Sequence, residues 1–258
     1  MHITLCNAQD KILASSTKHD DYSLYLVYAE PYHEGDYITL SVEEEGLYYL
    51  QLDEVLGKQV VYLKEESSFL IPVQENRLTC YHPSAFRARM HLITLEKAFG
   101  LGRRNLACNP YDHHYTTNIY PHASANVETR GEMVFAARNA IDGVLANAGH
   151  GLYPYASWGI NQDPKAELHL DFGRPILLEE VRLTLRADWP HDSWWTEATL
   201  IDSDGEVSIL PLKKTAQPQR FVRNPKKVTS LSLCNLKKAD DPSPFPALTQ
   251  IETWGYDL

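Results

Sequence analysis

The sequence predicts an all-β protein built from two β-sandwich domains. Short runs of alternating aromatic and β-branched residues recur along most of the chain, and turns that contain Gly, Asp or Glu separate them. The chain has 258 residues, which is long enough for two ordinary domains. Its composition shifts toward Gly, Asn, Pro and His just after residue 100. We therefore expect one domain over residues 1–100 and a second over residues 101–258.

Strand-like runs follow one another closely between residues 22 and 73, at a length and spacing typical of a sandwich or barrel. They are YSLYLVYA, DYITLSV, LYYLQL, QVVYL and SFLIPV. The acidic run from Glu43 to Glu45 precedes a glycine and predicts a charged hairpin turn. The later run HLITLEKA fits either a last strand or a short helix, because periodicity does not separate the two at this length.

The second half contains one helix candidate, the segment GEMVFAARNAIDG, whose small apolar residues recur at helical spacing until Gly143 ends it. Strand-like runs return after a long loop. They are AELHLDFG, LEEVRLTLR, TEATLIDSDG, VSILPLK, QRFV, VTSLSLCNL and ALTQIETWG. The SDG sequence at residues 203–205 lies between two of these runs and predicts a hairpin turn.

Composition excludes several classes of partner. Hydrophobic residues make up 43% of the chain, but no run approaches the roughly 18 apolar residues of a membrane-spanning helix. A net charge of -10 argues against nucleic acid, which is bound through clustered Lys and Arg. The first residues lack the regions of a secretory signal, so we expect a cytoplasmic protein, or a secreted one if a leader has been removed. The four widely spaced cysteines predict free, buried thiols.

Several short motifs of the second half occur in a characteristic order. They are NLA at 105–107, NAIDG at 139–143, SW at 157–158, the runs LHLDFG and LEEVRL, and the closing TQIETWG. In these motifs the second half resembles the discoidin-like, or coagulation-factor C-type, domains of the galactose-binding-like superfamily, which include many carbohydrate-binding modules. The resemblance implies a jelly-roll sandwich that binds its ligand on loops at one end and is usually not an enzyme. Fourteen residues separate Gly143 from Trp158, more than in many relatives, so we transfer no ligand geometry.

The Asp-Gly turn after the expected helix predicts a structural calcium ion. An aspartate beside several backbone carbonyls makes the oxygen-rich, irregular cage that calcium accepts. The resemblance implies a ligand set of the Asp142 side chain, carbonyls near Asn139 and Val144, and Glu252 of the last strand. Asn147 is a weaker candidate. The alternative is that Asp142 only makes the turn and accepts hydrogen bonds from nearby backbone N–H groups.

Two aromatic loops have the composition of a sugar-binding site, since a sugar ring needs a flat aromatic face with fixed polar groups beside it. The loops are AGHGLYPYASWG and RADWPHDSWW, which hold four of the five tryptophans. The residues we expect to contact the ligand are His150, Arg186, Asp188, His191, Asp192 and Trp194. Arginine would supply a planar pair of donors, aspartate a pair of acceptors and tryptophan the stacking face. Arg186 and Asp188 could instead pair with each other.

The sequence therefore predicts a non-catalytic protein that binds a carbohydrate through loops of its second domain. One alternative is a polysaccharide hydrolase or lyase with a His/Asp site near the domain cleft, for which Asp188 and Asp192 are the pair to test. Six of the eleven histidines lie between residues 113 and 191, but no HExxH or nucleophile motif accompanies them. Another alternative is a structural homo-oligomer that assembles through the tyrosine-rich first domain.

Overall fold

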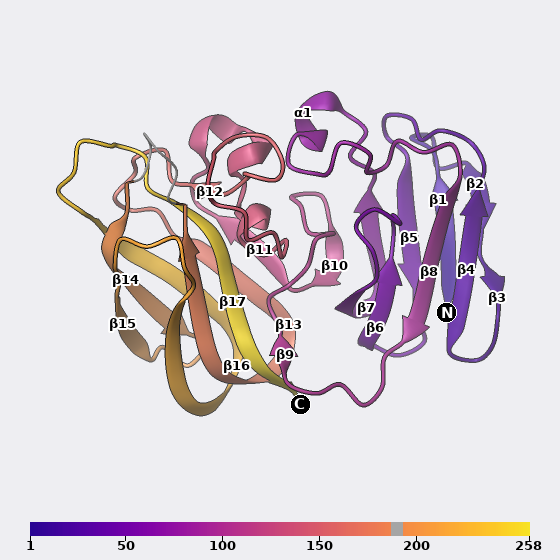
Figure 1. Cartoon of the computed structure of the whole chain (residues 1–258). Coiled ribbons are helices and arrows are strands. Elements are labelled where there is room, and N and C mark those ends of the chain that lie inside the picture. Colours follow the sequence, from indigo (N-terminus) through magenta and orange to yellow (C-terminus); the bar gives the residue numbers. More distant parts are fainter. Residues whose placement is uncertain (187–192) are drawn as a thin grey trace.

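The computed structural model describes residues 1–186 and 193–258, which form two β-sheets side by side (Figure 1). The first sheet contains β1 (His2–Cys6), β2 (Ile12–Ser15), β3 (Thr17–Lys18), β4 (Ser23–Tyr28), β5 (Tyr37–Ser41), β6 (Gly46–Gln51), β7 (Gln59–Leu70), β8 (His91–Lys97) and β10 (Thr117–Tyr120). The second contains β9 (Arg104–Asn105), β11 (His122–Ala125), β12 (Trp158–Gly159), β13 (Leu168–Leu185), β14 (Trp195–Asp202), β15 (Val207–Pro211), β16 (Gln219–Lys238) and β17 (Ala247–Asp257). The predicted all-β class is confirmed.

The first sheet is antiparallel and curls back on itself. Its strand order is β2-β1-β5-β7-β6-β8-β4-β3, and only Ser16 separates the two end strands in the sequence. The Ser16 hydroxyl accepts a hydrogen bond from the Ile3 N–H at 2.9 Å, which holds this corner against β1. In β5 and β6, for example, buried residues alternate with half-buried ones, as the period of two requires. The ambiguous run HLITLEKA is strand β8, which pairs with β4 and β6 and buries Ile93 and Leu95.

Two long strands, β13 and β16, shape the second sheet. The start of β13 pairs with β11 and its later part pairs with β17, while β16 runs beside both parts. The pairing breaks between Asp171 and Ile176, where Gly173 has a φ of +66°. A Cβ on Gly173 would lie 2.4 Å from the Tyr120 ring, so glycine permits this bend. The two parts enclose a core that includes Trp158 and Trp195.

The predicted helix over residues 131–143 is wrong. The structure has three short 3₁₀ turns there: η1 (Thr129–Gly131), η2 (Met133–Phe135) and η3 (Ala137–Ala140). Glu132 and Ala136 are extended and separate the turns. Side chains supply hydrogen-bond partners for backbone groups that a helix would have paired. The Glu128 carboxylate accepts from the Ala137 N–H at 2.8 Å, and the Asn139 amide donates to the Met133 carbonyl at 2.8 Å. Local side-chain hydrogen bonds therefore replace the helical ones. Among the described residues, the other helical element is α1 (Glu75–Leu78).

The chain crosses between the sheets more than once. It enters the second sheet at β9, returns to the first with β10, which pairs with β7, and re-enters the second at β11. Tyr111 and Ile119 consequently belong to the core of the first sheet. The Tyr111 hydroxyl donates to the Asp53 carbonyl at 3.3 Å. A division of the chain at residue 100 stays a prediction, because the next twenty or so residues pack against both sheets.

The cysteines and the helices bear on two expectations that were based on composition. All four cysteines are free thiols; Cys6 and Cys80 are buried, whereas Cys108 and Cys234 are half-buried. Within the described ranges, no helix has the length and apolar character needed to cross a membrane.

His113 is buried where the returning segment packs against the first sheet. Its Nε2 lies 3.0 Å from the Leu70 carbonyl, and its Nδ1 accepts a hydrogen bond from the Tyr115 N–H at 3.0 Å. The ring is therefore neutral, with its proton on Nε2. Burial lowers the pKa of His113 to about 3, because a charged imidazole would lose its water and its Tyr115 contact.

We expect the buried, neutral His113 to lower the free energy of unfolding in acid. The unfolded chain takes up a proton near pH 6.5, whereas the folded chain does so only near pH 3, so stability is lost as the pH falls through this window. Relative to His113→Gln, the wild-type free energy of unfolding should fall by about 1.4 kcal/mol per pH unit below pH 6.5. Urea titrations between pH 4 and 7 measure it. The exposed His19→Gln is the control, and parallel pH profiles for the wild type and His113→Gln would contradict the assignment.

Candidate functional site

The long loop between η3 and β12 contacts parts of both sheets. The Asn147 amide donates to the Leu185 carbonyl at 2.9 Å and to the Ala216 carbonyl at 2.8 Å, which ties the loop to the end of β13. Farther along, the Tyr153 N–H donates to the Thr79 carbonyl at 3.0 Å, beside α1. Ala156 then enters the core of the first sheet. The loop is long because it must reach partners on both sides.

A cavity of about 240 Å³ lies at the end of the second sheet, and both His150 and Arg186 line it. Arg186 directly follows β13, and its N–H donates to the Ala247 carbonyl at 3.0 Å. The Arg186 guanidinium also donates to the Phe245 carbonyl at 2.8 Å, which fixes a cation in the wall. His150 comes from the long loop and is exposed. The structure thus brings together two of the six predicted ligand residues from different segments.

Amide groups and aromatic rings complete the cavity wall. Asn161 and Gln162, both exposed, follow β12 and line the cavity together with the rings of Phe135 and Phe245. The Phe245 side chain is 37% exposed, so its ring is accessible to a ligand. The wall therefore combines planar apolar faces with several donors and acceptors, as small-molecule sites usually do.

Backbone strain is concentrated at this cavity. Arg130, Asn161 and Gln162 all have a positive φ, of 55°, 48° and 60°, and all three line it. Non-glycine residues adopt this conformation at a cost of roughly 1–3 kcal/mol each, and such residues cluster at functional sites. The Asn161 N–H donates to the Thr129 hydroxyl at 2.9 Å, which helps to hold the strained turn. The surrounding fold thus holds the backbone turn from which the two amide side chains extend.

Of the other predicted ligand residues, Trp194 is the one within the described part of the chain, and it does not line this cavity. Asp188, His191 and Asp192, like Trp189, lie outside the described residues. Trp194 is half-buried and packs against the core, and its carbonyl accepts from the Ala239 N–H at 2.9 Å. The aromatic residues of the described wall are phenylalanines instead: Phe245 is exposed, whereas Phe135 is buried and its ring lies under the Arg130 guanidinium.

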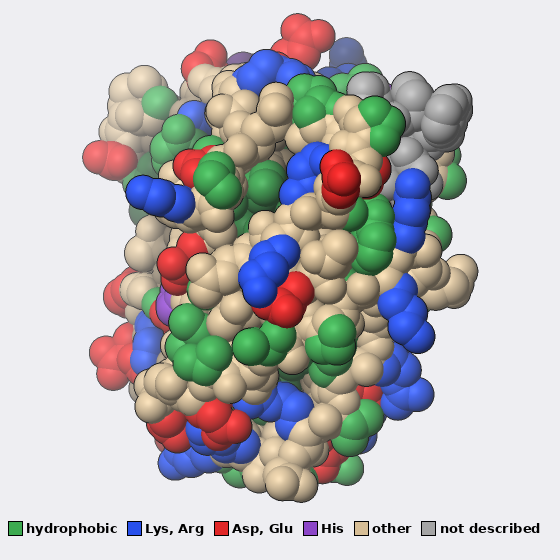
Figure 2. All heavy atoms as spheres, turned by 90° about the vertical axis from the view of Figure 1, so that its left-hand side faces the viewer, with side chains coloured by type: hydrophobic (Ala, Val, Ile, Leu, Met, Phe, Trp, Pro, Cys, Tyr) green, Lys and Arg blue, Asp and Glu red, His purple; other side chains and the backbone are tan. Residues whose placement is uncertain are grey.

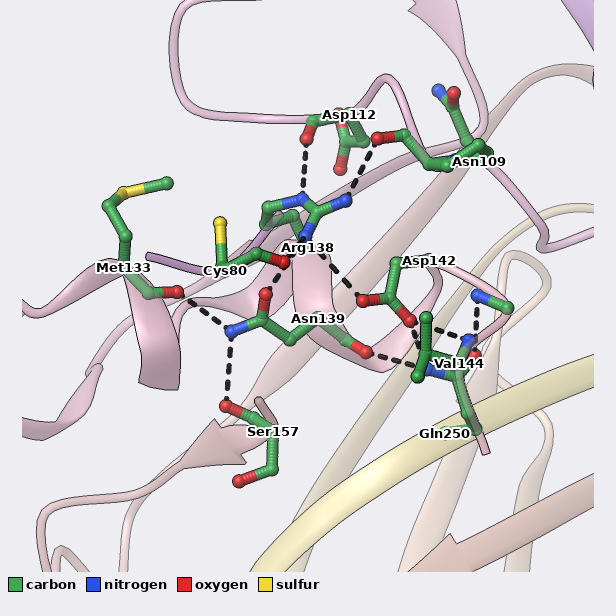
Figure 3. A network of polar contacts seen from close by, with 12 residues as sticks. Cys80, Asn109, Asp112, Met133, Arg138, Asn139, Asp142, Val144, Ser157 and Gln250 are labelled. Atoms are coloured by element: carbon green, nitrogen blue, oxygen red, sulfur yellow. Dashed lines mark hydrogen bonds and ion pairs between the residues drawn. The ribbon is translucent and has the colours of Figure 1, made fainter. Parts of the chain in front are cut away.

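The residues predicted to hold calcium lie close together but contact protein donors (Figure 3). The Gln250 amide nitrogen donates to the Asn139 carbonyl at 2.6 Å and to the Asp142 carboxylate at 2.7 Å. The Gln250 oxygen accepts from the Gly143 N–H at 3.0 Å, which fixes the orientation of the amide. Val144 presents its N–H to the Asp142 carboxylate at 2.8 Å. A buried glutamine thus occupies the centre of the predicted oxygen cage.

A positive charge already faces this aspartate. One Asp142 oxygen lies 3.5 Å from the Arg138 guanidinium, and both side chains are buried. Burial raises the pKa of Asp142 to about 6, although Arg138 acts in the opposite direction. Glu252 lies on β17 and accepts a hydrogen bond from the Trp254 indole at 3.3 Å. These residues, so arranged, do not fit a calcium ion, which would have to displace Gln250. Calcium binding itself stays a prediction.

Histidine and carboxylate pairs lie on the other side of Arg138. His122 contacts the buried Asp112 carboxylate at 2.6 Å, and His114 contacts Glu128 at 2.9 Å. These hydrogen bonds raise the pKa of both histidines. Among the described residues, no group of His, Cys, Asp and Glu has the arrangement of a metal site.

Sequence reasoning missed the amides and phenylalanines of the cavity and the role of Gln250. Gln250 lies in the closing TQIETWG motif, two positions before Glu252, so an inward-facing glutamine beside a predicted ligand was the available signal. Asn161 and Gln162 follow the SWG sequence after one intervening residue, Ile160, but no rule of spacing connects them with His150 or Phe245.

We expect the turn around Asp142 to be stable without calcium. The wild-type thermal midpoint should not change with millimolar calcium or with EDTA, since Gln250 already satisfies the oxygens. Gln250→Glu replaces a donor with a second buried carboxylate and should cost about 3 kcal/mol of unfolding free energy. Calcium should restore part of this loss, because the variant cage then has the ligands of an ion site.

Differential scanning calorimetry of the wild type, Gln250→Glu and the exposed control Gln217→Glu, with and without calcium, checks this expectation. A wild-type midpoint that rises with calcium would show instead that an ion binds and rearranges Gln250.

No protein-family model matches the sequence. No curated protein matches it either. The structure is similar to several solved carbohydrate-binding modules. These include the family 32 module of NanJ from C. perfringens in complex with galactose (14% identity, 51% of this chain, 91% of that chain, TM-score 0.39), a fucose-binding module from Streptococcus pneumoniae (12%, 60%, 99%, 0.41) and the lectin domain of lectinolysin complexed with Lewis B antigen (14%, 60%, 98%, 0.43). At these values the similarity is one of shape, so a function must rest on the geometry of the site.

Proposed function

We propose that this protein binds a carbohydrate, without transforming it, in the cavity lined by His150 and Arg186. The observation that carries the proposal is the convergence of a fixed cation, an imidazole, two amide side chains on a strained backbone turn and two phenylalanines around about 240 Å³. Sugar hydroxyls need several donors and acceptors at fixed positions, and the C–H face of the ring needs an apolar plane. The same set of groups occurs around this cavity.

The size of the cavity favours a single sugar ring. Sites for drug-sized ligands usually measure about 300–1,000 Å³, so a cavity of about 240 Å³ suits a smaller ligand. The nearest charges on the rim are partly neutralised, since Arg130 donates to both Glu132 oxygens at 2.6 and 2.8 Å. We further propose that the second sheet is a discoidin-type sandwich whose end loops form this site. No ion takes part in the proposed binding.

Removing polar groups from the cavity should weaken binding. We expect His150→Ala with Gln162→Ala to lower the affinity at least about tenfold, because two side chains worth about 1 kcal/mol each in hydrogen bonds are lost. Both residues are exposed, so circular dichroism should show an unchanged fold. A glycan array identifies a binding sugar, and isothermal titration calorimetry measures its affinity for each variant.

The control variant is His19→Ala with Gln217→Ala, which removes the same residue types from exposed positions outside the cavity. Equal affinities of the wild type and the cavity variant would contradict this site. Failure of the wild type to bind any neutral or charged glycan of the array would contradict the proposed function itself.

A further inference from the structure

A second, larger hollow adjoins the cavity described above. It has a volume of about 830 Å³ and shares the wall residues Ile160, Gln162 and Pro246 with the small cavity. Gln162 therefore belongs to the wall between the two hollows. We call the larger hollow the groove. It runs over β14 and β16, beneath the loop that connects β16 to β17.

The loop over the groove is held in place by its own hydrogen bonds. The Lys238 ammonium donates to the carbonyls of Ala239 and Asp241, each at 2.9 Å. The Ser243 N–H donates to the Asp241 carboxylate at 3.1 Å. Prolines at 242, 244 and 246 fix φ along the same segment. The groove is consequently a pre-formed feature, and a ligand would not have to order the loop.

The charges of the groove neutralise each other. Lys237 lies 2.5 Å from Glu197, and Lys238 lies 3.4 Å from Asp241. These four side chains all line the groove, and their formal charges cancel. Figure 2 shows the face of the molecule on this side, where basic and acidic side chains stand next to each other near the middle. A polyanionic ligand would meet no excess of positive charge here.

The uncharged residues of the groove are of the same kinds as those of the small cavity, namely amides and apolar side chains. Asn235 is exposed and has a φ of 48°, so an amide residue on a strained backbone recurs in the groove. Ile209, which is 62% exposed, and the proline rings provide apolar surface on the opposite sides. Amides between apolar surfaces match a chain of hydroxylated rings better than they match an ion or a charged peptide.

We infer that the groove is a second part of the binding site and that the ligand is a neutral oligosaccharide. One ring occupies the small cavity, and the chain continues over Gln162 into the groove, which has room for more than one further ring. This inference rests on the proposed function, because it assumes that the small cavity takes a sugar.

Calorimetry with sugars of increasing length tests the inference. The probes are glucose, galactose, mannose and N-acetylglucosamine, each with its linear di-, tetra- and hexasaccharide, and the hexamer of galacturonic acid. For the sugar that binds, we expect the hexasaccharide to bind at least tenfold more tightly than the monosaccharide. The galacturonate hexamer should bind no more tightly than the neutral monosaccharide.

Two variants separate the groove from the cavity. Asn235→Gly with Ile209→Ser removes groove contacts, keeps the strained backbone at 235 and should reduce hexasaccharide affinity to that of the monosaccharide. Monosaccharide affinity should not change in this variant. His150→Ala with Phe245→Ala should weaken both ligands. The exposed Val222→Ser on β16 is the matched control and should leave both affinities as in the wild type.

Each outcome decides a separate point. If monosaccharide and hexasaccharide bind equally well, or the groove variant leaves hexasaccharide affinity unchanged, the groove is not part of the site, although the proposed function survives. Tighter binding of the galacturonate hexamer overturns the neutral character of the ligand. If no sugar of any length binds, the proposed function fails, and the inference fails with it.

Discussion

One buried cation, Arg138, holds the structure together. A charged group in the interior is tolerated only when it is paired and hydrogen-bonded. Its guanidinium donates to the carbonyls of Asp112 and Pro110 at 2.9 and 2.8 Å and to the Asn139 amide oxygen at 3.0 Å, and it faces Asp142 (Figure 3). It also packs over the ring of Tyr81, 4.5 Å from its centre. Segments that are distant in the sequence thereby contact one guanidinium, and the position of each segment depends on the positions of the others.

This constraint explains the irregular backbone between β11 and β12. The side chains of Arg138 and Asn139 contact each other, but the first also reaches the segment of residues 109–112 and the second the carbonyls of Met133 and Ser157. A regular helix would not satisfy both sets of partners, so the segment breaks into short turns. The last turn leads to Asp142, which contacts the Gln250 amide of β17 and the Arg138 guanidinium. These two groups connect the turn to other segments, as a bound cation does in a calcium site.

The candidate binding surface lies at the end of the second sheet and is built differently from this network. Its groups come from loops that β12, β13 and β17 hold at fixed positions. Strained residues such as Asn161 and Gln162 persist there because neighbouring strands fix both ends of the turn. The adjoining groove adds paired charges and prolines, which give it shape without a net field. A rigid sandwich thus presents a polar, pre-formed surface, which is the requirement for binding a ligand as strongly hydrated as a sugar.

The sequence by itself determined the β-strands and the hairpin turn at residues 203–205, because alternation and turn chemistry are local properties. The predicted ligand residues included His150 and Arg186, and the structure brings these two to one cavity. It did not identify Gln250 or the break-up of the helix. The Asp142–Gln250 contact joins residues 108 positions apart, and the turns of η1 to η3 follow from partners on other segments. Only the tertiary structure could decide these points, because hydrogen bonds between distant segments override local periodicity.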